Sequence, residues 1–225
     1  MAAAGRQNAL SVIAVSDRGA MLDASSVFYM DKLVTDGHGI GVVSMEQTVA
    51  ENIRELAKAK DKPIADMVIA VLDRPRHAGL IEEIRAAGAG TRILLDGDVA
   101  GGINAARYET RIDMCLGVGG SPEAVVTACA IKALGGFIEA RLAPKDEAER
   151  QRGIAAGLDM DRTYDAEGLV RGGNTMFVAT GVTDGGLVEG VRRKGSMLRT
   201  ESIVLRARSG TLRRIISEHV ASRWL

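Results

Sequence analysis

Polar and glycine residues follow three apolar segments in the middle of the sequence. Arg74–Arg76 follow the segment DMVIAVL, Asp96–Asp98 follow RILL, and Gly120 and Glu123 follow DMCLGVG. Arginine binds phosphate oxygens through two parallel hydrogen bonds, carboxylates accept hydroxyl groups or hold a divalent metal, and glycine lets a ligand approach the main chain. Together these residue types predict a binding site for a phosphorylated sugar.

The elements around these residues predict that they meet at one edge of a sheet. Continuous apolar runs at 66–73, 91–96 and 113–120 alternate with helical patterns at 74–88, 99–109 and 121–136. Apolar runs separated by helices indicate β-α-β units in a largely parallel sheet. Ligands of such sheets bind at the carboxyl ends of the strands, which is where all three polar segments lie.

Each polar segment also has a simpler interpretation. Arg74 and Arg76 suit the solvated start of a helix, Asp96 and Asp98 suit helix caps, and Glu123 suits a first helical turn, where the helix dipole favours a carboxylate. The Asp-Gly-Asp segment resembles the start of a calcium loop, but VAGGINAAR after it lacks the remaining oxygen ligands. The pattern alone therefore leaves metal, sugar and phosphate unassigned.

The flanking segments complete an α/β pattern. Segments 9–17 and 27–34 are typical of two adjacent strands, and the segment from Ser44 to Pro63 has helical spacing that ends at the proline. Further on, the sequence predicts a strand at FIEARLAP, a charged helix at KDEAERQRGIAAGLD and a strand from Thr175 that ends in a loop at Gly186. Arg206 and Arg208 alternate with apolar residues, as on the solvent face of a strand, and His77 is a candidate neighbour of the ligand.

Composition narrows the function further. The 225 residues carry 29 basic and 29 acidic side chains, so no net field attracts the chain to nucleic acid or to an anionic membrane. No run reaches the roughly 20 apolar residues of a membrane span, and no signal peptide is evident. Cys115 and Cys129 lie in apolar segments without metal-ligand spacing, and we interpret them as small buried hydrophobes. A cytoplasmic location is expected.

The combination of segments resembles class II fructose-1,6-bisphosphatase. FYMDKL, VLDRPRH, LLDGDVA, GVGGSPE, FVATGVTDGGLVEGV and TESIVLRARSGTLRRI occur in the family's order, from about Gln7 nearly to the C-terminus. The resemblance implies the family's sugar-phosphatase fold, with central β-α-β units in a largely parallel or mixed sheet. It also implies fructose 1,6-bisphosphate as substrate and Mg²⁺ or Mn²⁺ as cofactor.

The resemblance also assigns roles to matching residues. It implies that Glu123 is a metal ligand, that the two aspartates of the Asp-Gly-Asp segment hold sugar hydroxyls, and that the tyrosine of FYM contacts the bisphosphate. The expected substrate contacts are Tyr29, Arg74, Pro75, Arg76, Asp96, Gly97, Asp98 and Gly120. No catalytic residue is identified.

The sequence departs from the family pattern at its start. The family has an N-terminal segment with an Asp-Pro-Ile-(Asp or Glu)-Gly-Thr motif that supplies most metal ligands, and MAAAGRQNAL aligns just beyond it. We therefore expect residues 1–41 to be the remnant of an N-terminal phosphatase domain and residues 42–225 to form a C-terminal α/β sugar-phosphate-binding region. Because one carboxylate cannot hold the two ions of a typical phosphatase site, we expect the isolated chain to bind sugar phosphate better than it cleaves it.

Three functional classes stay open at this point. The first is a class II fructose-bisphosphatase polypeptide, which acts as a homo-oligomer or with an N-terminal fragment. The second is a non-catalytic module that binds sugar phosphates, and the third is a partner of a complete phosphatase subunit. Sedoheptulose bisphosphate is a second possible substrate, because both sugars present two phosphates and similar hydroxyls. Nucleic acid and membranes are not expected as partners.

Overall fold

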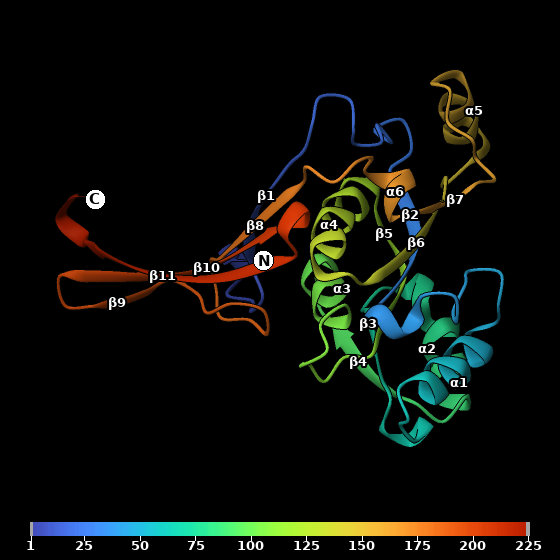
Figure 1. The fold of residues 1–225 in the computed structure, drawn as a ribbon, viewed down its shortest axis with the longest axis horizontal. Helices are drawn as coiled ribbons and strands as arrows, with labels where there is room; N and C mark the ends of the chain where they lie inside the picture. Colours follow the sequence, from blue (N-terminus) through green and yellow to red (C-terminus); the bar gives the residue numbers. More distant parts are fainter. Residues whose placement is uncertain (1, 224–225) are drawn as a thin grey trace.

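The structure, a computed structural model, describes residues 2–223. Two β-sheets and the helices between and beside them form successive layers (Figure 1). The strands are β1 (Leu10–Val15), β2 (Tyr29–Thr35), β3 (Val68–Leu72), β4 (Gly90–Leu94), β5 (Met114–Gly120), β6 (Phe137–Leu142), β7 (Thr163–Asp165), β8 (Met176–Gly181), β9 (Arg192–Lys194), β10 (Met197–Arg206) and β11 (Thr211–Val220). The helices are α1 (Val49–Ala59), α2 (Ala78–Ala86), α3 (Val99–Ala105), α4 (Ser121–Leu134), α5 (Glu147–Ala155) and α6 (Ala166–Leu169).

The larger sheet is mixed rather than largely parallel, and a mixed sheet is one of the two arrangements that the family resemblance implied. Its six strands run in the order β4-β3-β5-β2-β6-β7. The β3–β4 and β3–β5 pairs are parallel, whereas β2, β6 and β7 pair in the antiparallel sense. The predicted β-α-β units are therefore confirmed, and they make up the parallel half of the sheet.

Two apolar cores cover the two faces of this sheet. Helices α1 and α2 pack on one face, around buried Ile53, Leu56 and Ile84. Helices α3 and α4 lie on the other face, and α4 also contacts the five-stranded antiparallel sheet formed by β1, β8, β9, β10 and β11 (Figure 1). Phe177 on β8 is fully buried in this larger core. Burying one such side chain stabilises a fold by about 2 kcal/mol.

Local sequence signals account for the helix boundaries. Thr48 and Glu51 form a reciprocal capping box at the start of α1, and the helix ends before the predicted stop at Pro63. Pro122 lies in the first turn of α4, where its missing N–H costs nothing, and Gly135 ends that helix in the left-handed conformation. The predicted helices around residues 99–105 and 147–155 are confirmed as well.

The expectation that segments 9–17 and 27–34 are neighbouring strands is wrong. Strand β1 pairs with β8 in the smaller sheet, and β2 lies between β5 and β6 in the larger one. Their burial explains the difference: β2 is almost entirely buried, as an interior strand must be, whereas Ile13 and Val15 of β1 are exposed. Residues 1–41 thus contribute to both sheets, and the division at residue 41 stays a prediction.

Two further predictions concern the arginines near the end of β10 and the absence of a membrane-spanning helix. Arg206 is exposed at the end of β10, as predicted, whereas Arg208 lies in a short 3-10 helix after the strand. Within residues 2–223, no helix is both long enough and apolar enough to cross a bilayer.

A buried charge cluster fixes the amino ends of the parallel strands. The Asp113 carboxylate lies 2.9 Å from Lys60 Nζ and 2.6 Å from Lys62 Nζ, and it accepts a hydrogen bond from Val68 N at the start of β3. Burial raises the pKa of Asp113, but the bonds from Lys62, Lys60 and Val68 outweigh it, and the net pKa lies below its usual range. The carboxylate is therefore more stable in the folded chain than in the unfolded chain.

We expect Asp113→Asn to destabilise the chain by about 2 kcal/mol at pH 7, because Lys62 loses its carboxylate partner and Lys60 keeps only Asp36. Since the folded-state pKa is lowered, the contribution of Asp113 is present above its unfolded pKa and is lost as pH falls through the folded value. Urea unfolding at pH 7 and at acidic pH measures both effects. A difference between the variant and the parent chain that does not shrink at low pH would contradict this account.

Candidate functional site

The predicted site residues meet at the carboxyl edge of the parallel strands. Arg74–Arg76 follow β3, Asp96 follows β4, and Gly120 ends β5. Strand β2 runs in the opposite direction, and its first residue, Tyr29, pairs with Gly120. The antiparallel pairing therefore brings Tyr29 to the same edge as the three segments after the parallel strands.

Arg74 is held by the two loops that follow β3 and β4. Its Nη2 donates to Asp96 Oδ1 at 2.6 Å, and its Nη1 donates to the carbonyl oxygens of Asp73 and Leu95 at 2.7 and 3.0 Å. These bonds use part of the guanidinium and fix the position of the Asp96 carboxylate. Arg74 therefore joins the two loops. Asp96 is partly exposed, and its second carboxylate oxygen forms no ion pair within residues 2–223.

Arg76 lies over the ring of Tyr29 and remains exposed. Its guanidinium carbon is 4.8 Å from the ring centroid, and its Nε and Nη2 donate to Val118 O at 3.2 and 2.6 Å. These contacts occupy one side of the planar group and leave the Nη1 hydrogens for another acceptor. Arg76 is consequently an oriented cation at the edge of the sheet, suited to an anionic group.

Asp98 is buried and forms an ion pair with Lys32 of β2. Lys32 Nζ also lies 3.4 Å from Gly120 O, so its ammonium group connects β2, the start of α3 and the end of β5. The pair passes directly over Gly119, where a Cβ atom would overlap the Asp98 carboxylate and lie 2.6 Å from Lys32 Nζ. Only glycine fits between the strand and this ion pair.

Glu123 and Gly120 form the N-terminal end of helix α4. Gly120 is the N-cap residue, and the Glu123 carboxylate folds back over it so closely that a Cβ atom at Gly120 would overlap Glu123 Oε2. Glu123 is exposed. The positive end of the dipole of this 14-residue helix thus faces the same edge as Arg76 and favours an anion there.

Sequence reasoning missed two charged residues of β2. Lys32 and Asp31 lie within an otherwise apolar strand, and a charge in a buried strand is the signal that points to them. Burial raises the pKa of Asp31, although bonds and charges from Lys32, His77 and Arg141 act in the opposite direction. Asp31 and Arg76 both line a hollow on the α1–α2 face of the sheet.

His77 is buried next to Arg76, and its place as a neighbour of the ligand stays a prediction. The ring is 2% exposed, its Nε2 accepts a hydrogen bond from Val118 N, and its Nδ1 lies 2.9 Å from Leu72 O. Both ring nitrogens are therefore used within the protein, with the proton on Nδ1. His77 ties the loop after β3 to β5, where it helps to position Arg76.

The cysteines are buried, as the sequence predicts. Burial raises the pKa of the Cys115 thiol to about 12 and that of the Cys129 thiol to about 11. Both thiols stay protonated at neutral pH, so neither supplies a thiolate nucleophile or metal ligand.

A divalent metal centre needs several converging ligands, and the described residues do not supply them. Within residues 2–223, no three His, Cys, Asp or Glu side chains come together in an arrangement that could hold a metal ion. Glu123, the ligand implied by the family resemblance, belongs to no such group within the described residues. The described side chains alone therefore do not fit a two-metal centre.

The sequence similarity to known proteins extends over nearly the whole chain. The sequence model of the family described as bacterial fructose-1,6-bisphosphatase, glpX-encoded, matches residues 1–219. This chain belongs to that family. It is 37% identical to the class 2 fructose-1,6-bisphosphatase of Haemophilus influenzae, over 97% of this chain and 69% of that protein. It is 35% identical to fructose-1,6-bisphosphatase 1 class 2 of Escherichia coli, over 99% of this chain and 70% of that protein.

Membership in the bisphosphatase family confirms the resemblance and the α/β fold class. The positions of Tyr29, Arg76, Gly120 and Glu123 at one edge agree with a common site, whereas the individual roles implied for them stay predictions. The simpler interpretation of Asp98 as a helix cap also needs revision: Asp98 stands at the N-cap position of α3, but its carboxylate makes no capping hydrogen bond and pairs with Lys32.

We expect Gly119→Ala to destabilise the chain by about 2 kcal/mol, because the added methyl group collides with the buried Lys32–Asp98 pair. Gly79→Ala is the matched control: its Cβ would meet no atom within 4 Å, and alanine is the better helix former in α2. Thermal unfolding of both variants distinguishes a steric requirement from a general effect of replacing glycine. Equal stability of the two variants would contradict the close approach at Gly119.

Proposed function

We propose that this chain acts in the hydrolysis of fructose 1,6-bisphosphate to fructose 6-phosphate and phosphate. The observation that carries the proposal is the convergence of Tyr29, Arg76, Gly120 and Glu123 in a chain of the bisphosphatase family. The relatives from Haemophilus influenzae and Escherichia coli are named for this activity. Sedoheptulose bisphosphate presents the same types of groups and is the substrate to compare with it.

In the proposed complex, Arg76 binds a phosphate group of the substrate. Its guanidinium is already oriented by Val118 O and by the Tyr29 ring, so little side-chain freedom is lost on binding. The start of α4 adds the positive end of its dipole.

The aspartates would fix the sugar ring. Asp96 has one oxygen bound to Arg74 and a second that is free to accept a sugar hydroxyl. Asp98 is held by Lys32 in the same way, through Oδ2, which leaves Oδ1 as an acceptor. Gly97 adopts a positive φ of 67°, which permits the turn that separates the two carboxylates. Arg74, Pro75 and Gly97 thus serve mainly to position the groups that contact the sugar.

Reactions of this family depend on a metal, and we propose Mg²⁺ or Mn²⁺ with Glu123 as one ligand. The metal would stabilise charge on the phosphoryl oxygens and activate water. The residues described by the structure do not form a complete metal centre. What the side chains themselves provide is binding and orientation of the sugar phosphate.

A cytoplasmic location and a homo-oligomeric assembly, or an association with an N-terminal fragment, also belong to this proposal. Apolar side chains exposed on β1, with Ile13 61% and Val15 57% exposed, support contact with another polypeptide surface. Light scattering of the purified chain measures its mass in solution. A monomer that gains no mass when an N-terminal fragment is added would exclude both assemblies.

The sharpest test of the proposed substrate site is binding of fructose 1,6-bisphosphate to Arg76→Gln. We expect the dissociation constant to rise at least about tenfold, because a charge-assisted pair of hydrogen bonds is lost. The matched control is Arg85→Gln, since Arg85 is an exposed arginine in the last turn of α2. Calorimetric titrations in which both variants bind like the parent chain would contradict the proposed site.

A phosphate-release assay distinguishes a catalytic polypeptide from a non-catalytic binding module. With Mn²⁺ and fructose 1,6-bisphosphate, release by the parent chain that disappears in Glu123→Ala supports a catalytic polypeptide. Binding without release favours the alternative of a non-catalytic sugar-phosphate module, and it would also support the expectation that this chain binds better than it cleaves. Parallel assays with sedoheptulose bisphosphate decide between the two sugars.

A further inference from the structure

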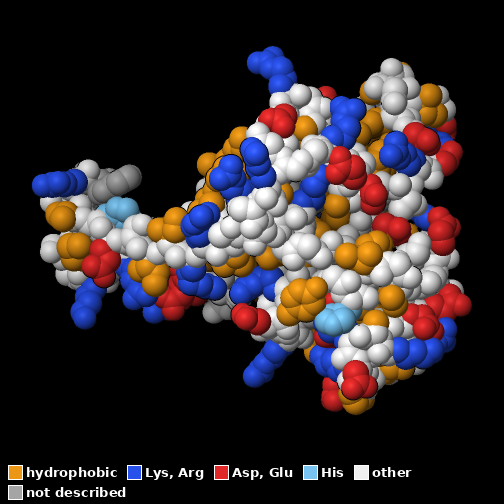
Figure 2. Space-filling model, viewed as in Figure 1, with side chains coloured by type: hydrophobic (Ala, Val, Ile, Leu, Met, Phe, Trp, Pro, Cys, Tyr) orange, Lys and Arg blue, Asp and Glu red, His pale blue; other side chains and the backbone are white. Residues whose placement is uncertain are grey.

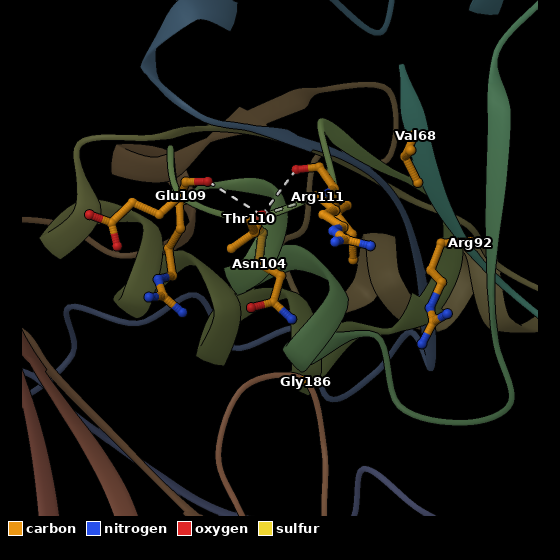
Figure 3. A pocket seen from close by; sticks show the side chains of 9 residues that line it. Val68, Arg92, Asn104, Glu109, Thr110, Arg111 and Gly186 are labelled. Atoms are coloured by element: carbon orange, nitrogen blue, oxygen red, sulfur yellow. Dashed lines mark hydrogen bonds between the residues drawn. The ribbon is translucent and has the colours of Figure 1, made fainter. Parts of the chain in front are cut away.

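A second polar cavity lies at the opposite edge of the larger sheet. Its volume is about 560 Å³, which is typical of sites for small ligands. Figure 3 shows it between the loop after α3, strand β4 and the loop that carries Gly186. The polar side chains that line it are Arg92, Asn104, Arg107, Glu109, Thr110 and Arg111.

This cavity is separate from the candidate substrate site. Val68, the first residue of β3, and Ile112, two residues before β5, line its wall, so it lies at the amino ends of the parallel strands. Asp98 precedes the first residue of α3, and Asn104 lies in its last turn. The two sites are therefore at opposite ends of the same short helix.

The charge of the lining is strongly positive. The lining holds three arginines, Arg92, Arg107 and Arg111, and one carboxylate, that of Glu109. In the part of the chain that the structure describes, none of the three guanidinium groups takes part in an ion pair or a side-chain hydrogen bond. This differs from Arg74 and Arg76 at the other edge, which are held by neighbouring carbonyl groups. Three unpaired arginines around one cavity favour a multiply charged anion.

Asn104 adds a second, independent observation. The residue is 8% exposed, and its Oδ1 atom is buried with no hydrogen-bond donor among residues 2–223. Its amide points toward the loop that carries Gly186 (Figure 3). A buried acceptor without a donor is costly, and a ligand hydroxyl or amine in the cavity would satisfy it.

The local backbone is arranged so that it does not repel an anion. The C-terminal end of a helix carries partial negative charge on its free carbonyl groups. Here Thr110 Oγ1 donates to Asn104 O at 2.5 Å, and Arg107 N donates to the same carbonyl oxygen at 3.2 Å, so this acceptor is already used. The Thr110 bonds also hold the loop that presents Arg107 and Arg111.

We infer that this cavity binds a phosphate monoester that also carries hydroxyl groups. The guanidinium groups of Arg92, Arg107 and Arg111 bind the phosphate, and Asn104 Oδ1 accepts a hydrogen bond from a hydroxyl group. Sugar phosphates and nucleoside monophosphates both have this chemistry. The site is additional to the substrate site proposed at the carboxyl edge.

The test is calorimetric titration of the full chain with fructose 6-phosphate, adenosine monophosphate and inorganic phosphate. It is made in the Arg76→Gln background, in which the carboxyl-edge site is weakened. We expect one of the two esters to bind, and Arg107→Gln/Arg111→Gln to weaken that binding at least tenfold. Arg208→Gln, a change at an exposed arginine far along the chain, is the control and should leave binding unchanged. The ester that binds more tightly shows whether the cavity prefers a sugar phosphate or a nucleoside monophosphate.

A second variant tests the role of Asn104. Asn104→Leu removes the acceptor and nearly preserves the side-chain volume. The ester should then bind no more tightly than inorganic phosphate, whereas the affinity for inorganic phosphate should not change. Thermal unfolding checks that each variant is folded, and Arg107→Lys/Arg111→Lys, which keeps the charge, should bind with intermediate affinity. Failure of both esters to bind, or binding that Arg107→Gln/Arg111→Gln leaves unchanged, would overturn the inference.

Discussion

The buried ion pair between Lys32 and Asp98 is the interaction on which the carboxyl edge of the sheet depends. Lys32 is 6% exposed, and burying its charge is favourable only because Asp98 and the carbonyl oxygen of Gly120 face it. The pair links an interior strand, the start of α3 and the end of β5. Gly119 must be glycine because the pair crosses directly over its Cα atom.

The other charged groups at this edge are arranged around that pair. Arg74 connects the loops after β3 and β4, and Arg76 rests on Tyr29 and on Val118 O. His77 holds the same residue of β5, because its Nε2 accepts a hydrogen bond from Val118 N. Preorganised groups of this kind lose little entropy when a ligand binds. Figure 2 shows arginine and lysine side chains distributed over the visible face among acidic and apolar ones. The chain also has zero net charge. The proposed binding of an anion at the carboxyl edge therefore rests on local geometry and not on a field of the whole protein.

Much of this arrangement follows from local sequence patterns. Continuous apolar runs and capping signals predict β3, β5, α1 and α4, and the rule for parallel sheets predicts that Arg76, Asp96 and Gly120 meet. Pairing between distant segments is a different matter. Strand β1 pairs with β8, more than 150 residues along the chain, and no local pattern specifies that partner. The two strands near the N-terminus therefore looked adjacent in sequence although they belong to different sheets.

Side-chain partners are equally hard to predict from the sequence. The Lys32–Asp98 pair and the two bonds of His77 require the register of β2, β3 and β5, which the sequence alone does not define. The arginine-lined cavity at the amino edge combines residues from β4, the loop after α3 and a loop of the smaller sheet. Such sites become visible only when the whole chain is folded.

The most direct measurement of the central claim is a crystal structure of the chain with bound fructose 6-phosphate. The account predicts sugar density at the carboxyl edge, with the phosphate beside Arg76 and the start of α4 and with hydroxyl groups on Asp96 and Asp98. An edge that stays empty at saturating ligand, while the Lys32–Asp98 pair is intact, would contradict it.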